Sequence, residues 1–197
     1  MDLKNVAPKL TVFFLMIAAM ISLVACGTNP VETKYHDPEM DFSALRTAAV
    51  MPLANLTRDQ LAAERVRDTF INSLMATGVL YVIPPGEVAR AIQQTQIVDP
   101  TAPSTEEINK ITAVLQADAV FTGAVREYGE VRSGTTAANV ISVSMEMFEA
   151  RSQKVVWVAS STRGGISLAD RLLGSGGQPM NEVTQAAIDD LVNKLLY

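Results

Sequence analysis

The residue best suited to covalent chemistry in this sequence is Cys26, the only cysteine among 197 residues. A thiolate is a strong nucleophile, so a cysteine can accept a lipid that its neighbours could not take. Leu23, Val24 and Ala25 come directly before Cys26, and Gly27 follows it. The small Ala25 leaves room for a peptidase at the bond before the cysteine. These four residues resemble the bacterial lipobox, and the resemblance implies cleavage after Ala25 and attachment of a diacylglycerol to the Cys26 sulfur.

The residues before Cys26 have the layout of a secretory leader. Lys4 and Lys9 make the first nine residues basic, and residues 11–24 form an apolar run. Basic, apolar and small residues in that order are typical of a signal peptide. The apolar run is shorter than the about 20 residues that span a membrane. The alternative is a signal anchor with an incidental cysteine, but the position of the sole cysteine favours a lipobox at residues 23–26.

These features divide the chain into a lipoprotein signal peptide (1–25), a lipidated cysteine with a polar tether (26–44) and one periplasmic domain (45–197). Two acyl chains would make the membrane attachment stable. Gly27 is not the aspartate that conventionally retains lipoproteins at the inner membrane, which favours the periplasmic face of the outer membrane. Inner-membrane anchoring and surface exposure stay open as alternatives. His36 lies in the tether and is interpreted as a solvated linker residue.

Composition and motifs point away from several classes of function. The formal net charge is −5 and Lys and Arg are not clustered, which argues against nucleic-acid binding. One cysteine and one histidine cannot form a disulfide or a zinc site, so neither a metal nor a cofactor is expected. The adjacent carboxylates Glu106/Glu107 and Asp189/Asp190 would point in different directions on a helix. We therefore expect no catalytic site and no enzymatic activity.

Hydrophobic periodicity predicts a single α/β domain with a mixed sheet of about five strands in the order β-α-β-α-α-β-β-β-α. The predicted strands are 47–53, 80–83, 119–128, 139–149 and 154–159. The predicted helices are 58–77, 87–94, 105–115 and 179–195. No internal repeat is evident.

Local signals predict three helix ends, two of them on the first helix and one on the third. Thr57 with Gln60, and Ser104 with Glu107, have the spacing of capping boxes. Gly78 is suited to ending the first helix. The third helix is expected to turn four apolar side chains inward: Ile108, Ile111, Val114 and Leu115.

The strand 119–128 is β-branched, aromatic and free of proline, so it is expected at the centre of the sheet. Asp118 is expected to cap the turn that leads into it, in preference to a chemical role. The last three strands form an antiparallel meander in which 139–149 alternates, with Val143 and Met145 facing the core and Ser144 facing solvent. Helices are expected to cover one face of this sheet.

Several segments carry a resemblance to a known superfamily. They are a first strand ending in Pro52-Leu53, the segment 81–84 (YVIP), the stretch 117–129 (ADAVFTGAVREYG) and the hairpin entering 154–157 (KVVW). These resemble the superfamily of CsgG, LpoB and the TolB N-terminal domain, with the related small lipoproteins of Gram-negative bacteria. The resemblance covers residues 45–197 and implies an α/β fold on an envelope lipoprotein. Its members act as secretion pores, synthase activators or assembly parts.

One departure from that superfamily weakens the pore interpretation. A membrane barrel strand needs about 9–11 residues. The segment 130–138 is short and polar, and the strands on either side of it already belong to the core.

Candidate docking residues come from two places. Trp157 alternates with its valine neighbours, so it lies either in the core, which is favoured, or on the outer face as a binding anchor. Leu168, Leu172 and Leu173 lie between glycine clusters, where an apolar helical turn either folds back on the core or docks a partner.

The leading hypothesis is a non-enzymatic, lipid-anchored periplasmic adaptor or activator. It would attach to the membrane through its lipid and bind another envelope protein or itself. The rivals are an oligomeric subunit of a secretion or transport assembly and, less favoured, a cryptic enzyme.

The lipidation prediction is tested by Cys26→Ser. The precursor is expected to stay unlipidated and to leave the membrane fraction, because no other thiol can take the lipid. Fractionation followed by immunoblotting measures this. A processed Cys26→Ser chain that still sediments with membranes would contradict the prediction.

Overall fold

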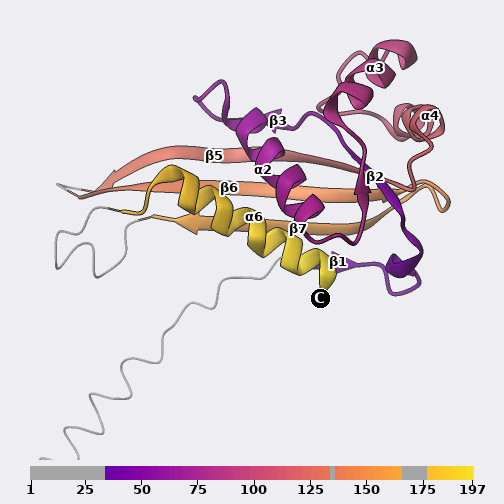
Figure 1. The fold of residues 1–197 in the computed structure, drawn as a ribbon. Coiled ribbons are helices and arrows are strands. Elements are labelled where there is room, and N and C mark those ends of the chain that lie inside the picture. The colour runs from indigo at the N-terminus through magenta and orange to yellow at the C-terminus, as the bar shows by residue number, and fades with distance from the viewer. Residues whose placement is uncertain (1–33, 134–135, 166–176) are drawn as a thin grey trace, which may run out of the picture. The chain divides into compact units, whose positions relative to one another are not determined.

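The computed structural model describes residues 34–133, 136–165 and 177–197, which form one mixed sheet flanked by helices (Figure 1). Their elements, in chain order, are β1 (Lys34–His36), η2 (Phe42–Ala44), β2 (Thr47–Val50), β3 (Ala54–Asn55), α2 (Ala62–Ala76), β4 (Tyr81–Val82), α3 (Pro85–Thr95), α4 (Thr105–Leu115), β5 (Ala119–Ser133), β6 (Thr136–Glu149), β7 (Lys154–Gly164) and α6 (Met180–Leu196). No helix among them is both long and apolar enough to cross a membrane.

The sheet joins a parallel part to an antiparallel part. Its order is β1-β7-β6-β5-β2-β4, and β3 also pairs with β5. β2 is parallel to both β4 and β5, whereas β5, β6 and β7 form an antiparallel meander. The predicted α/β class and meander are confirmed. The sheet has seven strands instead of about five. The two strands that the sequence did not predict are β1 and β3, which are only three and two residues long. Segments that short show no periodicity that a sequence pattern can detect.

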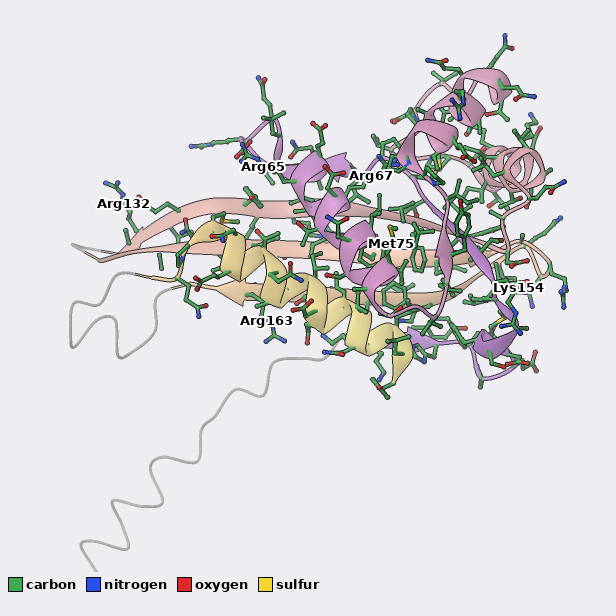
Figure 2. The ribbon with its side chains drawn as sticks, in the orientation of Figure 1. Arg65, Arg67, Met75, Arg132, Lys154 and Arg163 are labelled. Atoms are coloured by element: carbon green, nitrogen blue, oxygen red, sulfur yellow. The ribbon has the colours of Figure 1, made fainter. Side chains whose placement is uncertain are left out.

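Alternation along the meander separates two faces. In β6, Val143, Met145 and Met147 are buried, while Ser144 is half-buried and Glu146 is exposed. The buried side packs against α2 and α6, which lie along that face of the sheet (Figure 1). Arg163 of β7 points to the same side and forms an ion pair with Asp190 of α6 (Figure 2).

Helices cover part of the opposite face as well, which corrects the expectation that they lie on one face only. α3 and α4 form a second, smaller core there with Met51, Val120 and Phe148. These three side chains are at most 4% exposed and would otherwise face water. Beyond α3 and α4, no helix of the described residues covers the meander on this side.

Two of the three helix-end predictions are confirmed. Ser104 and Glu107 form a reciprocal capping box at α4, and Gly78 follows α2 with a φ of 66°. The box predicted at Thr57 is wrong, because α2 begins only at Ala62 and has no side-chain cap. Thr57 instead donates its hydroxyl to Asn55 Oδ1 at 2.8 Å. On α4, Val114 is also not inward but 41% exposed.

Residues 34–44, predicted to be a tether, are part of the domain. β1 pairs with β7, and the His36 ring nitrogen Nε2 donates to the Lys194 carbonyl oxygen at 2.7 Å. The His36 ring also lies 5.1 Å from that of Phe42. The interpretation of His36 as a solvated linker residue is therefore wrong. The last carbonyls of a helix lack helical partners, and His36 satisfies one at the end of α6.

Asp118 caps the turn into β5, as predicted. Its Oδ2 accepts hydrogen bonds from the backbone N–H groups of Arg46 and Thr47, each at 2.9 Å, and from the Thr47 hydroxyl at 3.1 Å. Burial raises the pKa of Asp118, but these donors together outweigh burial and hold the pKa below its ordinary value. One carboxylate thus joins the start of β2 to the start of β5.

The facing of β6 is tested by Val143→Asp and Ser144→Asp. Val143→Asp is expected to lower the free energy of unfolding by about 4 kcal/mol or to prevent folding, because it buries an unpaired charge. Ser144→Asp, its neighbour on the other face, should cost less than about 1 kcal/mol. Denaturant melts of both variants measure this, and equal losses would mean that the facing is misassigned.

The Asp118 cap is tested by Asp118→Ala. The loss at pH 7 is expected to be about 1–3 kcal/mol, since two backbone donors lose their acceptor. The folded-state pKa is depressed, so this stabilisation is present above the unfolded pKa of about 3.9 and is lost as the pH falls through the folded value. The gap between wild type and variant should therefore shrink below about pH 4. Asp68→Ala, which removes an exposed carboxylate, is the control. A gap that is constant from pH 7 to pH 3 would rule out the cap.

Candidate functional site

Trp157 is a core residue and not a docking anchor. It is fully buried, and its ring lies edge-on to Phe121 at 6.0 Å between centroids. Its indole Nε1 donates to the Lys194 carbonyl oxygen at 3.1 Å. Trp157 pairs with Met147 of β6, which places it on the face that α6 covers. The favoured core interpretation is therefore correct, and Trp157 is not available to bind a partner.

The other predicted site residues lie outside the described residues. These are the lipobox residues Leu23, Val24, Ala25 and Cys26, and the leucines Leu168, Leu172 and Leu173. Their roles stay predictions.

The face of the meander opposite α2 and α6, hereafter the open face, carries small and polar side chains. Thr122 donates its hydroxyl to Glu146 Oε1 at 2.8 Å, and Thr162 donates its hydroxyl to Ser142 Oγ at 3.1 Å. These cross-strand bonds satisfy polar groups without a covering layer, as is common for antiparallel sheets with one face toward water.

A hollow of about 360 Å³ is set into this open face. Its floor is formed by β5, β6 and β7, and includes Thr122, Ser144 and Val158. One wall is Ala54 of β3, and the other is the loop 101–103 between α3 and α4. The meander, β3 and the loop 101–103, which are separate in the sequence, thus meet around one concave surface.

Hydrogen bonds hold both walls of the hollow in place. Beside the α3–α4 wall, Asp99 Oδ1 accepts from the backbone N–H and the hydroxyl of Thr101, at 2.9 and 2.7 Å. These hydrogen bonds lower the pKa of the Asp99 carboxyl. On the β3 side, the Asn55 amide donates to the carbonyl oxygens of Asp59 and Gln60, at 2.8 and 3.2 Å. The concave shape is therefore present before any ligand binds, which reduces the ordering cost of binding.

The hollow is lined by one positively charged and one negatively charged side chain. Arg126 of β5 and Glu146 of β6 both line it, and neither is in a salt bridge within the described part of the chain. The other polar side chains at the hollow are hydroxyls. Such a surface can orient a polar protein segment through charge and hydrogen bonds, with Val158, Ala54 and Pro103 supplying apolar contact.

A second hollow, of about 490 Å³, is lined by acidic residues, but two of their carboxylates already accept hydrogen bonds that stabilise turns of the fold. Asp118 and Glu149 line it beside Asp41. The Glu149 carboxylate accepts from the backbone N–H groups of Arg151 and Ser152, and Asp118 caps the turn into β5. Across the described ranges, no group of three or more His, Cys, Asp or Glu side chains could hold a metal ion.

The open-face hollow was missed by sequence reasoning. The alternation of apolar and polar residues in β6 does place Ser144 and Glu146 on one side, so the sequence alone predicts a polar face there. No local pattern brings the α3–α4 loop and Ala54 to the same place, because Ala54 reaches the hollow only through the pairing of β3 with β5, and the loop meets it only in the folded domain.

The described residues define a small single-domain α/β protein with a mixed sheet. The sequence model of the "putative lipoprotein GNA1162-like" family matches residues 39–196. The chain belongs to this family. The predicted lipoprotein resemblance is confirmed at this level, whereas the likeness to CsgG and TolB stays a prediction. No curated protein sequence matches the chain significantly.

Two solved structures with TM-scores above 0.5 share the fold at low sequence identity. The PelC dodecamer from Paraburkholderia phytofirmans is 21% identical, with a TM-score of 0.54 over 84% of this chain and 96% of that one. Lipoprotein GNA1162 from Neisseria meningitidis is 18% identical, with a TM-score of 0.52 over 75% of this chain and 99% of that one. The LpoB C-terminal domain from Escherichia coli is 16% identical, covering 62% of this chain and 86% of that one, with a TM-score of 0.47.

Proposed function

We propose that this protein is a non-enzymatic, lipid-anchored adaptor or activator that binds another envelope protein at the periplasmic face of the outer membrane. Membership of a lipoprotein family and the sole cysteine at Cys26 support the anchoring. The observation that carries the binding role is the hollow on the open face. It is a concave, hydrogen-bonded surface of mixed character, and such surfaces suit protein recognition.

The length of the chain between the lipid and the domain supports a partner near the membrane. Only residues 27–33 separate Cys26 from β1, which begins at Lys34. At about 3.3–3.6 Å per residue, this connection reaches at most about 29 Å. The start of β1 is therefore within about 29 Å of the lipid-bearing residue, which keeps the domain close to the membrane and favours a partner in or near that membrane.

A second candidate function is that of a subunit in an oligomeric assembly. The fold similarity to PelC, a protein whose solved form is a dodecamer, favours this candidate.

The binding role is tested by site-specific photocrosslinking of the full, lipidated chain in cells. A photoreactive residue at Thr101 in the wall or at Ser144 in the floor is expected to give a discrete adduct. The same residue at Ala186, an exposed position on α6, is the matched control. The adduct mass separates a second copy from a different protein, which mass spectrometry then identifies. The absence of an adduct at Thr101 and Ser144, or equal adducts at Ala186, would contradict the proposal.

A further inference from the structure

We propose that one edge of the domain contacts the surface of the membrane that holds the lipid, through the side chains of Tyr35 and Tyr197. This edge consists of β1 and residues 193–197 at the end of α6, and is hereafter called the anchor edge. The inference rests on the proposed lipid attachment at Cys26 and adds the surface of the domain that faces the bilayer.

The connection to the lipid leaves the domain from this edge. Only residues 27–33 lie between Cys26 and Lys34, so the start of β1 stays within about 29 Å of the lipid-bearing residue. β1 is the outermost strand on its side of the sheet, and β4 is the outermost strand on the other, about 24 Å away at about 4.8 Å per strand. Attachment through β1 therefore keeps this edge, on average, nearer to the bilayer than the β4 edge.

Two exposed aromatic side chains lie beside that point. Tyr35 in the middle of β1 is 48% exposed, and Tyr197 is 88% exposed. The His36 ring nitrogen Nε2 donates to the Lys194 carbonyl oxygen at 2.7 Å, which joins β1 to the last turn of α6. The Tyr197 backbone N–H donates to the Asn193 carbonyl oxygen at 3.0 Å, so Tyr197 continues that turn. The C-terminus therefore lies beside β1 (Figure 1).

The two tyrosines lie on either side of the edge of the sheet. Tyr35 pairs with Val158, which lines the hollow, so the Tyr35 side chain is on the open face. Tyr197 follows α6, which covers the opposite face. An edge with one aromatic side chain on each side can contact a flat surface while the sheet stands away from that surface.

The surface of a bilayer suits the side chains of the anchor edge. A tyrosine combines an apolar ring with a polar hydroxyl, and such side chains are enriched at the level of the lipid headgroups. Lys34 is exposed next to Tyr35, and a lysine can lay its apolar stem along an interface while its ammonium reaches lipid phosphates. After β1, the exposed carboxylates Glu39 and Asp41 line the second hollow instead.

The lipid explains how so small a contact suffices. Two tyrosines and a lysine would bind a free domain to a bilayer only weakly. A covalently attached lipid makes the contact intramolecular and gives the anchor edge a high effective concentration at the surface. The bilayer is present wherever the lipidated chain is, which favours it over a protein as the occupant of this edge.

This contact also orients the hollow. β7, β6 and β5 form its floor and follow β1 in the sheet, so the floor lies within about 15 Å of the anchor edge at about 4.8 Å per strand. With the anchor edge on the membrane, the hollow opens sideways along the bilayer. A partner in or near the same membrane meets the hollow at that height.

The contact is tested with the full, lipidated chain in vesicles of phosphatidylethanolamine and phosphatidylglycerol whose acyl chains are brominated near the headgroup. Bromine quenches indole fluorescence only at short range, and the sole native tryptophan, Trp157, is fully buried. Tyr35→Trp and Tyr197→Trp are each expected to lose emission relative to unbrominated vesicles. Tyr81→Trp is the matched control and should lose none, since Tyr81 is exposed at the β4 edge.

A second substitution separates contact from proximity to the lipid attachment alone. Adding Tyr197→Ser to Tyr35→Trp removes one of the two contacts, so most of the quenching at position 35 should be lost. Adding Tyr81→Ser instead should leave the quenching unchanged. Thermal melts of every variant separate lost contact from lost folding. Quenching at position 35 that is insensitive to Tyr197→Ser, or equal quenching at positions 35, 197 and 81, would overturn the contact.

These outcomes are distinct from failure of the proposed function. A chain that does not sediment with the vesicles would contradict the lipid attachment itself and, with it, the contact. A chain that sediments but shows no quenching at positions 35 and 197 would overturn only the contact. If such a chain also forms a protein adduct in cells through a photoreactive residue at Tyr35, the edge belongs to a protein partner and not to the bilayer.

Discussion

The central constraint in this fold is that β5 must pair with a parallel strand on one side and an antiparallel strand on the other. Asp118 joins β5 to its parallel neighbour β2 at the point where β5 begins. Its carboxylate binds the backbone N–H groups of Arg46 and Thr47 at the start of β2, and the Asp118 backbone N–H donates to the Thr47 carbonyl oxygen at 3.1 Å. The two strands are thereby held in register at one end, and β6 and β7 add to the far side of β5.

That arrangement gives the two faces of the sheet different roles. On one face, Phe121 contacts Phe70 of α2 and Trp157 of β7, with ring centroids 5.2 and 6.0 Å apart. This aromatic row, covered by α2 and α6, concentrates the apolar burial and its stabilisation. Because the face under α2 and α6 supplies most of the core, the open face of the meander is free to carry polar residues and a hollow.

The carbonyl oxygen of Lys194, near the end of α6, ties the helix to the edge of the sheet. It accepts from both the Trp157 indole and the His36 imidazole. The Lys194 side chain donates to the Ser160 carbonyl oxygen at 3.0 Å and to Asp190 at 2.9 Å. β1, the first strand after residues 27–33, is therefore attached to the last helix of the domain. The polar N-terminal segment thus ends in defined contacts with the core.

Local physics explains which elements the sequence determined by itself. The period of two in β6, the reciprocal Ser104 and Glu107 pair and the positive φ of Gly78 each depend on residues that are neighbours in the chain. The predicted turn role of Asp118 also followed from its position between a helix and a strand. The class of the fold, its meander and the identity of its central strand could therefore be predicted. So could the lipid attachment site, which stays a prediction.

Long-range contacts decided the rest. Thr57 fits a capping box locally, but the Asn55 and Asp59 side chains organise that loop and move the start of α2 to Ala62. His36 is polar in a polar segment, and only the carbonyl at the end of α6 gives it a buried partner. Pairing with Met147 turned Trp157 to the covered face. The hollow combines β3, the α3–α4 loop and the meander, and no local pattern encodes such a meeting, because it exists only once the sheet is assembled.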